Sequence, residues 1–142
     1  MLERIFSSPT QIMLNKSMDA AWLKNEVIAD NMTNVDTPGF KRSEVIFEEK
    51  LKKVLYNSTK DVKLIKTDSK HIHKKEKDLA DIDNIKPEIR TINNLSYRND
   101  ENNVDIDVEA AKMTKNKIYY DTLAQGMSNE IRLLRMAITG RG

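Results

Sequence analysis

The first third of the chain carries an apolar pattern with the spacing of an amphipathic helix. Ser8 and Pro9 predict its start, because serine is a favoured N-cap and proline is tolerated at the first helical position. Beyond them, apolar positions follow alternating steps of four and three residues, the heptad spacing of a coiled-coil-like seam. The seam positions, six of them apolar, are Leu14, Met18, Ala21, Asn25, Ile28, Met32 and Val35.

A second apolar stripe accompanies the seam on the same predicted helix. Met13, Ala20 and Val27 lie seven residues apart, so the helix is expected to contact more than one neighbour. Asn25 interrupts the seam at a position where a buried amide can fix the register of paired helices. An exposed amide fits the same pattern equally well, and the sequence does not decide between the two.

The helix is predicted to end near residues 34–36. Pro38 disfavours the helical conformation of Thr37, and Pro38-Gly39 fits the central pair of a type II turn. This break separates the first helix from the rest of the chain.

A second long helix is predicted from about residue 104 to residue 139, where Gly140 is the expected C-terminal stop. At 1.5 Å per residue the two helices would reach about 40 Å and about 50 Å, which is long for a compact domain of this size. The predicted fold is therefore mainly α, an elongated antiparallel pair of long N- and C-terminal helices that forms a coiled-coil-like core domain. The apolar face of the second helix consists of Met113, Tyr120, Leu123, Met127, Ile131, Leu134 and Ile138.

The middle of the chain has a weaker pattern. Residues 43–55 fit a short amphipathic helix capped by Ser43, residues 85–97 suggest short extended pieces, and no sheet is predicted. The expected organisation is a core helix with its turn (1–40), a weakly structured or small accessory segment (41–103) and a second core helix (104–142).

The composition leaves little material for a core. Of the 142 residues, 39% are hydrophobic, 32% charged and 6% aromatic, and the mean hydropathy is −0.62. Such a chain needs long helices or partners to bury its apolar surface. The net charge of +2 provides no strong attraction to nucleic acid or to an anionic membrane. Because neither a Sec leader nor a transmembrane stretch is recognisable, we expect no membrane insertion, and either a cytoplasmic location or export without an apolar leader.

No set of residues points to catalysis, a metal site or a cofactor, so no enzymatic activity is predicted. The chain contains no cysteine, which excludes disulfides, a thiol nucleophile and thiolate metal sites. Asp105, Asp107 and Glu109 lack the glycine and glutamate spacing of a calcium loop and are interpreted as acids that stabilise a helix N-terminus. His71 and His73 lack a third ligand and are interpreted as solvated.

A lysine-rich run in the middle segment supports one alternative function. In this interpretation the protein is a free-standing helical binding module whose lysine-rich segment binds an acidic partner. Interrupting acids and the absence of interleaved aromatics favour a simple solvated face instead. The run consists of Lys60, Lys63, Lys66, Lys70, Lys74, Lys75 and Lys77.

The segment that closes the first helix resembles the signature of the bacterial flagellar rod and hook axial proteins. It reads NMTNVDTPGFK over residues 31–41, with threonine at position 33 where the family usually has alanine. Residues 67–72 and 102–109 further resemble the proximal rod subunits of this family, although Glu101 replaces a glycine usual at that place. The matching motif residues are Asn31, Asn34, Thr37, Pro38, Gly39 and Phe40.

The resemblance implies a structural subunit of the periplasmic rod of the flagellar basal body. Such subunits pass through the flagellar type III export apparatus without a cleaved signal peptide, and their paired terminal helices stack with neighbouring subunits. The apolar positions of both helices are then the expected helix-packing and assembly residues. The implied partners are further copies of the chain, rod proteins of the FlgC and FlgF type, the adaptor FliE and the MS ring. No cofactor and no nucleic acid is implied.

Overall fold

The computed structural model describes residues 8–59, 82, 84–93 and 99–140. The two histidines, the lysine-rich run and residues 67–72 lie outside this part of the chain, so the interpretations attached to them stay predictions.

The first long helix, α2, spans Pro9–Thr33. The Ser8 Oγ accepts a hydrogen bond from the Gln11 N–H at 3.2 Å, and proline occupies the first helical position. At the other end Asn34 is the C-cap, and its N–H donates to the Asp30 carbonyl at 3.2 Å. Both predicted ends of the helix are confirmed.

The second long helix, α5, spans Ile106–Thr139. Asp105 is its N-cap, because the carboxylate accepts a hydrogen bond from the Asp107 N–H at 3.0 Å. Gly140 ends the helix in the left-handed conformation (φ +63°) and donates its N–H to the Met136 carbonyl. The predicted glycine stop and the predicted role of Asp105 are both confirmed.

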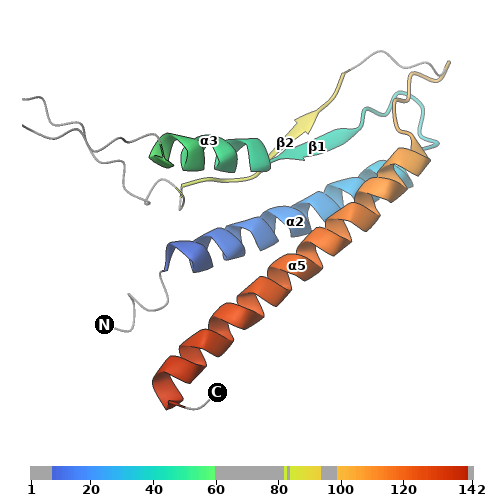
Figure 1. The fold of residues 1–142 in the computed structure, drawn as a ribbon. Helices are drawn as coiled ribbons and strands as arrows, with labels where there is room; N and C mark the ends of the chain where they lie inside the picture. Colours follow the sequence, from blue (N-terminus) through green and yellow to red (C-terminus); the bar gives the residue numbers. More distant parts are fainter. Residues whose placement is uncertain (1–7, 60–81, 83, 94–98, 141–142) are drawn as a thin grey trace, which may run out of the picture.

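The two helices lie side by side and antiparallel, as predicted (Figure 1). The Asn116 side chain donates to the Ala21 carbonyl at 2.8 Å, and a Cβ on Gly126 would lie 3.5 Å from Leu14 Cδ2. Residues that come later on α5 therefore face residues that come earlier on α2. With 25 residues in α2 and 34 in α5, the helices are about 37 Å and about 51 Å long. The end of α5 consequently extends beyond the start of α2.

A small sheet and a short helix cover the other side of α2 (Figure 1). Strand β1 (Ser43–Ile46) pairs antiparallel with β2 (Glu88–Thr91), with Ser43 opposite Thr91, and α3 (Glu48–Thr59) follows β1. The short helix predicted over residues 43–55 is present as α3, but its predicted start and its cap at Ser43 were wrong: Ser43 begins a strand, and the helix starts five residues later. Strand β2 lies within residues 85–97, where short extended pieces were predicted. The sheet itself was not predicted, because the pairing joins segments more than 40 residues apart, which local periodicity does not reveal.

Ala20, the middle residue of the second apolar stripe of α2, packs against this layer. Ala20 forms a buried cluster with Phe47 and Ile85, and Leu51 and Val54 of α3 pack against it. Helix α2 therefore contacts two neighbours, as the two stripes predicted. The core remains small: in the described part of the chain the buried apolar residues are Ala20, Ala21, Val27, Ile28, Val45, Phe47, Ile82, Ile85 and Val104.

An ion pair joins α2 to the start of α3. Lys24 Nζ donates to Glu48 Oε1 at 2.7 Å. Burial by itself raises the pKa of the Glu48 carboxyl, but the hydrogen bond from Lys24, its charge and nearby backbone N–H groups together lower that pKa below its ordinary value. The carboxylate is therefore held in its charged form against the lysine.

Glu101 offers a test of the backbone in the loop before α5. It adopts φ +59°, the left-handed region that glycine prefers. The flagellar rod proteins that the sequence resembles usually have glycine at this position. We expect Glu101→Gly to raise the free energy of unfolding by about 0.5–1 kcal/mol in urea denaturation, because relief of the left-handed conformation outweighs the added chain entropy.

The matched control is Glu26→Gly, an exposed glutamate inside α2, which should lower the free energy of unfolding by about 1 kcal/mol. Equal losses for both variants would contradict the assignment of backbone strain to Glu101.

Candidate assembly surface

The flagellar-type motif lies at the end of α2 and in the turn that leads to β1. Gly39 has φ +74°, and the Phe40 N–H donates to the Thr37 carbonyl at 3.3 Å, which confirms the predicted type II turn. The Gly39 N–H donates to the Asp100 carbonyl at 2.7 Å. The turn is thereby attached to the loop that leads into α5.

Asn102 holds this turn to the end of α2. Its side chain is fully buried, and its amide nitrogen donates to the carbonyls of Asn34, Val35 and Thr37 at 2.9–3.0 Å. Its amide oxygen accepts the N–H of Val104 at 2.7 Å. One side chain therefore joins three carbonyls at and just beyond the C-cap of α2, and at the same time shapes the entry to α5.

Asn103 occupies the next position and joins the two strands. Its amide oxygen accepts the Arg42 N–H at 2.7 Å, and its amide nitrogen donates to the Ile92 carbonyl at 2.7 Å. The Ile92 N–H reaches the Arg42 carbonyl directly at 2.9 Å. The side chain of Asn103 thus replaces one hydrogen bond of the ladder just outside the β1–β2 register.

Asn31, the first motif residue, pairs with the opposite edge of β1. Its amide nitrogen donates to the Ser43 carbonyl at 2.8 Å, and its amide oxygen accepts the Ser43 N–H at 2.9 Å. The same nitrogen donates to Glu109 Oε2 at 3.1 Å. The asparagine therefore acts as a short strand edge that links α2, β1 and α5.

Glu109 completes this network from the first turn of α5. Its side chain is 1% exposed, and Lys112 Nζ and Arg42 Nη1 lie 2.6 Å and 3.5 Å from Oε1. Two cations and one amide donor thus surround the buried carboxylate, as a buried charge requires. The polar side chains described in this and the preceding paragraphs that join α2, the sheet and the start of α5 are called the polar junction. They are Asn31, Arg42, Asn102, Asn103 and Glu109.

The predicted seam residues of α2 differ in burial. Ala21 and Ile28 are buried, whereas Asn25 is exposed. Of the two possibilities for Asn25, the structure shows the exposed amide and not the buried one that would fix the register. The remaining seam residues are half-buried: Leu14, Met18, Met32 and, beyond the end of the helix, Val35.

On α5 the predicted face is covered only along part of its length. The half-buried residues are Met113, Leu123, Met127 and Leu134, and the exposed ones are Tyr120, Ile131 and Ile138. Further large apolar residues on the long helices are exposed as well, among them Trp22 at 64% and Ile118 at 63%. Exposed apolar side chains at this density mark a surface for other proteins. We call the exposed large apolar residues of α2 and of residues 118–139 of α5 the assembly surface: Trp22, Ile118, Tyr119, Tyr120, Ile131, Leu133 and Ile138.

The described residues contain no cluster of histidine, cysteine or carboxylate side chains suited to a metal ion. Within the same residues no helix combines the length and the apolar character that crossing a membrane requires.

Known proteins match nearly the whole chain. The flagellar basal body rod protein FlgB of Bacillus subtilis (strain 168) is 31% identical over 136 residues, which cover 96% of this chain and 97% of that protein. FlgB of Borreliella burgdorferi is 34% identical over 126 residues, 87% of this chain and 91% of that protein. The chain belongs to the FlgB family of flagellar basal body rod proteins. FlgB of Aquifex aeolicus is more distant, at 26% identity over 91% of this chain and 92% of that protein. No protein-family model matches the chain.

FlgB family membership confirms the resemblance predicted from the motif. The structure adds why the motif residues are suited to their places: Asn31 pairs with β1, Asn34 caps α2 and Gly39 allows the turn. Asn34 also accepts a hydrogen bond from the Thr37 hydroxyl at 3.2 Å. Pro38 is exposed and Phe40 half-buried.

Sequence reasoning missed Asn102, Glu109 and Asn116 as buried polar residues. Glu109 was interpreted only as an acid at a helix N-terminus, but it is an internal carboxylate. A usable signal existed for two of them: Asn116 and Glu109 lie seven and fourteen residues before Leu123, on the face that the apolar residues of α5 share. No local pattern pointed to Asn102.

The role of Asn102 can be measured with a truncated side chain. We expect Asn102→Ala to lower the free energy of unfolding by about 2–3 kcal/mol, because three carbonyls and one N–H each lose a hydrogen bond to this side chain. The measurement is equilibrium unfolding in urea. Asn25→Ala is the matched control, an exposed asparagine within α2, and should change stability by less than about 0.5 kcal/mol. Similar small effects for both would show that the amide of Asn102 does not hold the helices together.

Proposed function

We propose that this chain polymerises into the proximal rod of the flagellum through its two terminal helices. As a member of the FlgB family it is a structural subunit of the flagellar basal-body rod and serves motility. The observation that carries the proposal is the assembly surface: the helices expose large apolar side chains along their length although the protein's own core is small.

The arrangement of the layers explains why these side chains stay uncovered. Helix α2 is covered by α5 on one side and by the β1, α3 and β2 layer on another. Trp22 lies two residues from buried Ala20, about 200° around the helix, and so points away from the Ala20 cluster. On α5, Ile118 lies two residues after buried Asn116, again about 200° around the helix, and so points away from the side that Asn116 faces. Neighbouring subunits would cover both positions.

The proposal includes a location and partners. We place the subunit in the periplasmic part of the basal body, reached through the flagellar type III export apparatus without a cleaved signal peptide. Its neighbours would be further copies of itself, rod proteins of the FlgC and FlgF type, and the adaptor FliE with the MS ring at the base. The segments 1–40 and 104–142 would form the assembling core and 41–103 the accessory part.

The subunit would act without catalysis, by carrying torque and enclosing the export channel. The alternative of a helical module that binds an acidic partner depends on residues 60–77, which lie outside the described residues, and nothing in the comparisons supports it.

Substitution of an exposed apolar residue tests the proposal without touching the core. We expect Trp22→Asp to abolish swimming on soft agar in cells that lack the native gene, because a charge would enter an interface between subunits. The purified variant should keep the helix content of the wild-type chain in circular dichroism, since the indole is exposed. Asn25→Asp, at an exposed position three residues later, is the control and should swim. Swimming cells with Trp22→Asp would contradict the placement of this surface between subunits.

The small core predicts that stability depends on concentration. We expect thermal unfolding of the purified chain to be broad at low concentration and to become sharper and shift upward as the concentration rises, because association stabilises the folded helices. A sharp transition at a temperature independent of concentration would show that the monomer completes its own core.

A further inference from the structure

The start of α5 exposes aliphatic side chains among acids. Ile106 and Val108 are exposed there, next to the exposed Glu101, Asp105 and Asp107. Of the cations nearby, Arg42 and Lys112 are held by the buried Glu109. Lys41 donates to the Glu101 carbonyl and leaves the Glu101 carboxylate at the surface. We call this region the acidic end; it consists of Glu101, Asp105, Ile106, Asp107 and Val108.

The other end of α5 exposes aliphatic side chains among bases. The face that packs on α2 continues through Ile131, Leu134 and Ile138, but α2 begins at Pro9 and leaves Ile131 54% and Ile138 72% exposed. Arg132 and Arg135 are exposed beside them, and Glu130 is the one acid among residues 127–140. We call this region the basic end; it consists of Ile131, Arg132, Leu134, Arg135 and Ile138.

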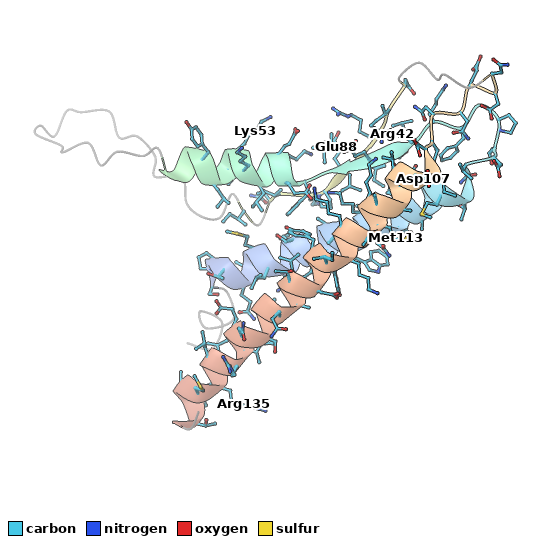
Figure 2. All side chains as sticks on the ribbon, turned by 45° about the vertical axis from the view of Figure 1, so that its right-hand side comes forward. Arg42, Lys53, Glu88, Asp107, Met113 and Arg135 are labelled. Carbon is cyan, nitrogen blue, oxygen red and sulfur yellow. The ribbon has the colours of Figure 1, made fainter. Side chains whose placement is uncertain are left out.

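We infer that the basic end of one copy binds the acidic end of a second copy, head to tail. The inference rests on the proposed function and names the contact by which copies stack. Asp107 and Arg135 lie at opposite ends of α5, 28 residues and about 42 Å apart, so one molecule cannot join its own two ends (Figure 2). A second copy carries both complementary surfaces, in charge and in apolar character.

Such a contact suits a rod. A head-to-tail interface joins two different patches, so each added copy leaves one free acidic end and one free basic end on the assembly. When the rotation between successive copies does not close a ring, the assembly grows as an open helix. The charges are exposed and therefore screened by salt, whereas the aliphatic residues of both ends provide apolar burial that salt does not weaken. The charges would select the orientation, because like ends repel.

Charge reversal in purified full-length chains tests this contact. Arg135→Glu and Asp107→Arg should each raise the concentration for half-maximal association roughly tenfold in sedimentation velocity, because each places like charges together. The double variant in one chain restores the opposite signs and should return toward wild-type association. A mixture of the two single variants should associate more strongly than either variant alone and form alternating assemblies, since two of its four end combinations are attractive and both join unlike variants.

Lys117→Glu is the matched control. Lys117 is exposed and precedes Arg135 by 18 residues, five helical turns, so both lie on the same face of α5 but only Arg135 is at the end. The control should associate like the wild type, and circular dichroism should show equal helix content for all variants. An unchanged midpoint for Arg135→Glu and Asp107→Arg, or a double variant no better than the weaker single one, would overturn the inference.

Cells separate this inference from the proposed function. If the wild-type chain restores swimming to cells without the native gene while both single variants swim equally well, the head-to-tail contact is wrong and the rod function stands. If single variants associate normally when purified yet stop swimming, the ends bind a different protein, which also overturns the inference. A wild-type chain absent from isolated basal bodies would instead refute the proposed function.

Discussion

The side-chain amide of Asn102 is the interaction on which the position of the two long helices depends. The carbonyls of Asn34, Val35 and Thr37 lie at and just beyond the C-cap of α2, and each accepts a hydrogen bond from this one amide. The amide comes from the loop that leads into α5, 65–68 residues away in the sequence. Its hydrogen bonds therefore hold the end of α2 and the entry to α5 together. Asn31 and Asn103 act in the same way on the β1–β2 sheet, because the oxygen and the nitrogen of each amide bind backbone groups in or next to the strands.

The polar junction explains how a chain with so small a core has a defined architecture. Hydrophobic contacts along two long helices tolerate sliding, since each turn resembles the next. Directional hydrogen bonds do not tolerate such sliding. The Asn116 amide can donate to the Ala21 carbonyl in only one register of the two helices, and the Asn31 amide can donate to both Ser43 and Glu109 in only one arrangement of α2, β1 and α5. The Asn116 amide oxygen is buried without a partner, which costs free energy. Register is thus specified at some expense of stability.

The elements that could be predicted are those whose cause is local. Ser8, Pro9, Asp105 and Gly140 act within one turn of their own helices, and the type II turn follows from two adjacent residues, so these boundaries follow from the sequence. The β1–β2 pairing and the contacts of Asn102 join distant segments, and no short window contains their cause. Ser43 shows the conflict directly. Its sequence context permits a helix cap, but pairing with Thr91 and with the Asn31 amide makes it the first residue of a strand.

Polar residues hold the fold of the subunit together while many apolar residues stay exposed, and assembly with other subunits explains this difference. A subunit that stacks with others must leave apolar surface uncovered until its neighbours arrive, so it cannot use that surface to hold its own shape. Trp22 and Ile118 remain exposed, while asparagines and one buried carboxylate hold the helices and the β1–β2 sheet together. The low hydrophobic content of the chain is then consistent with its role, because part of the burial that an isolated domain needs is expected to form between subunits.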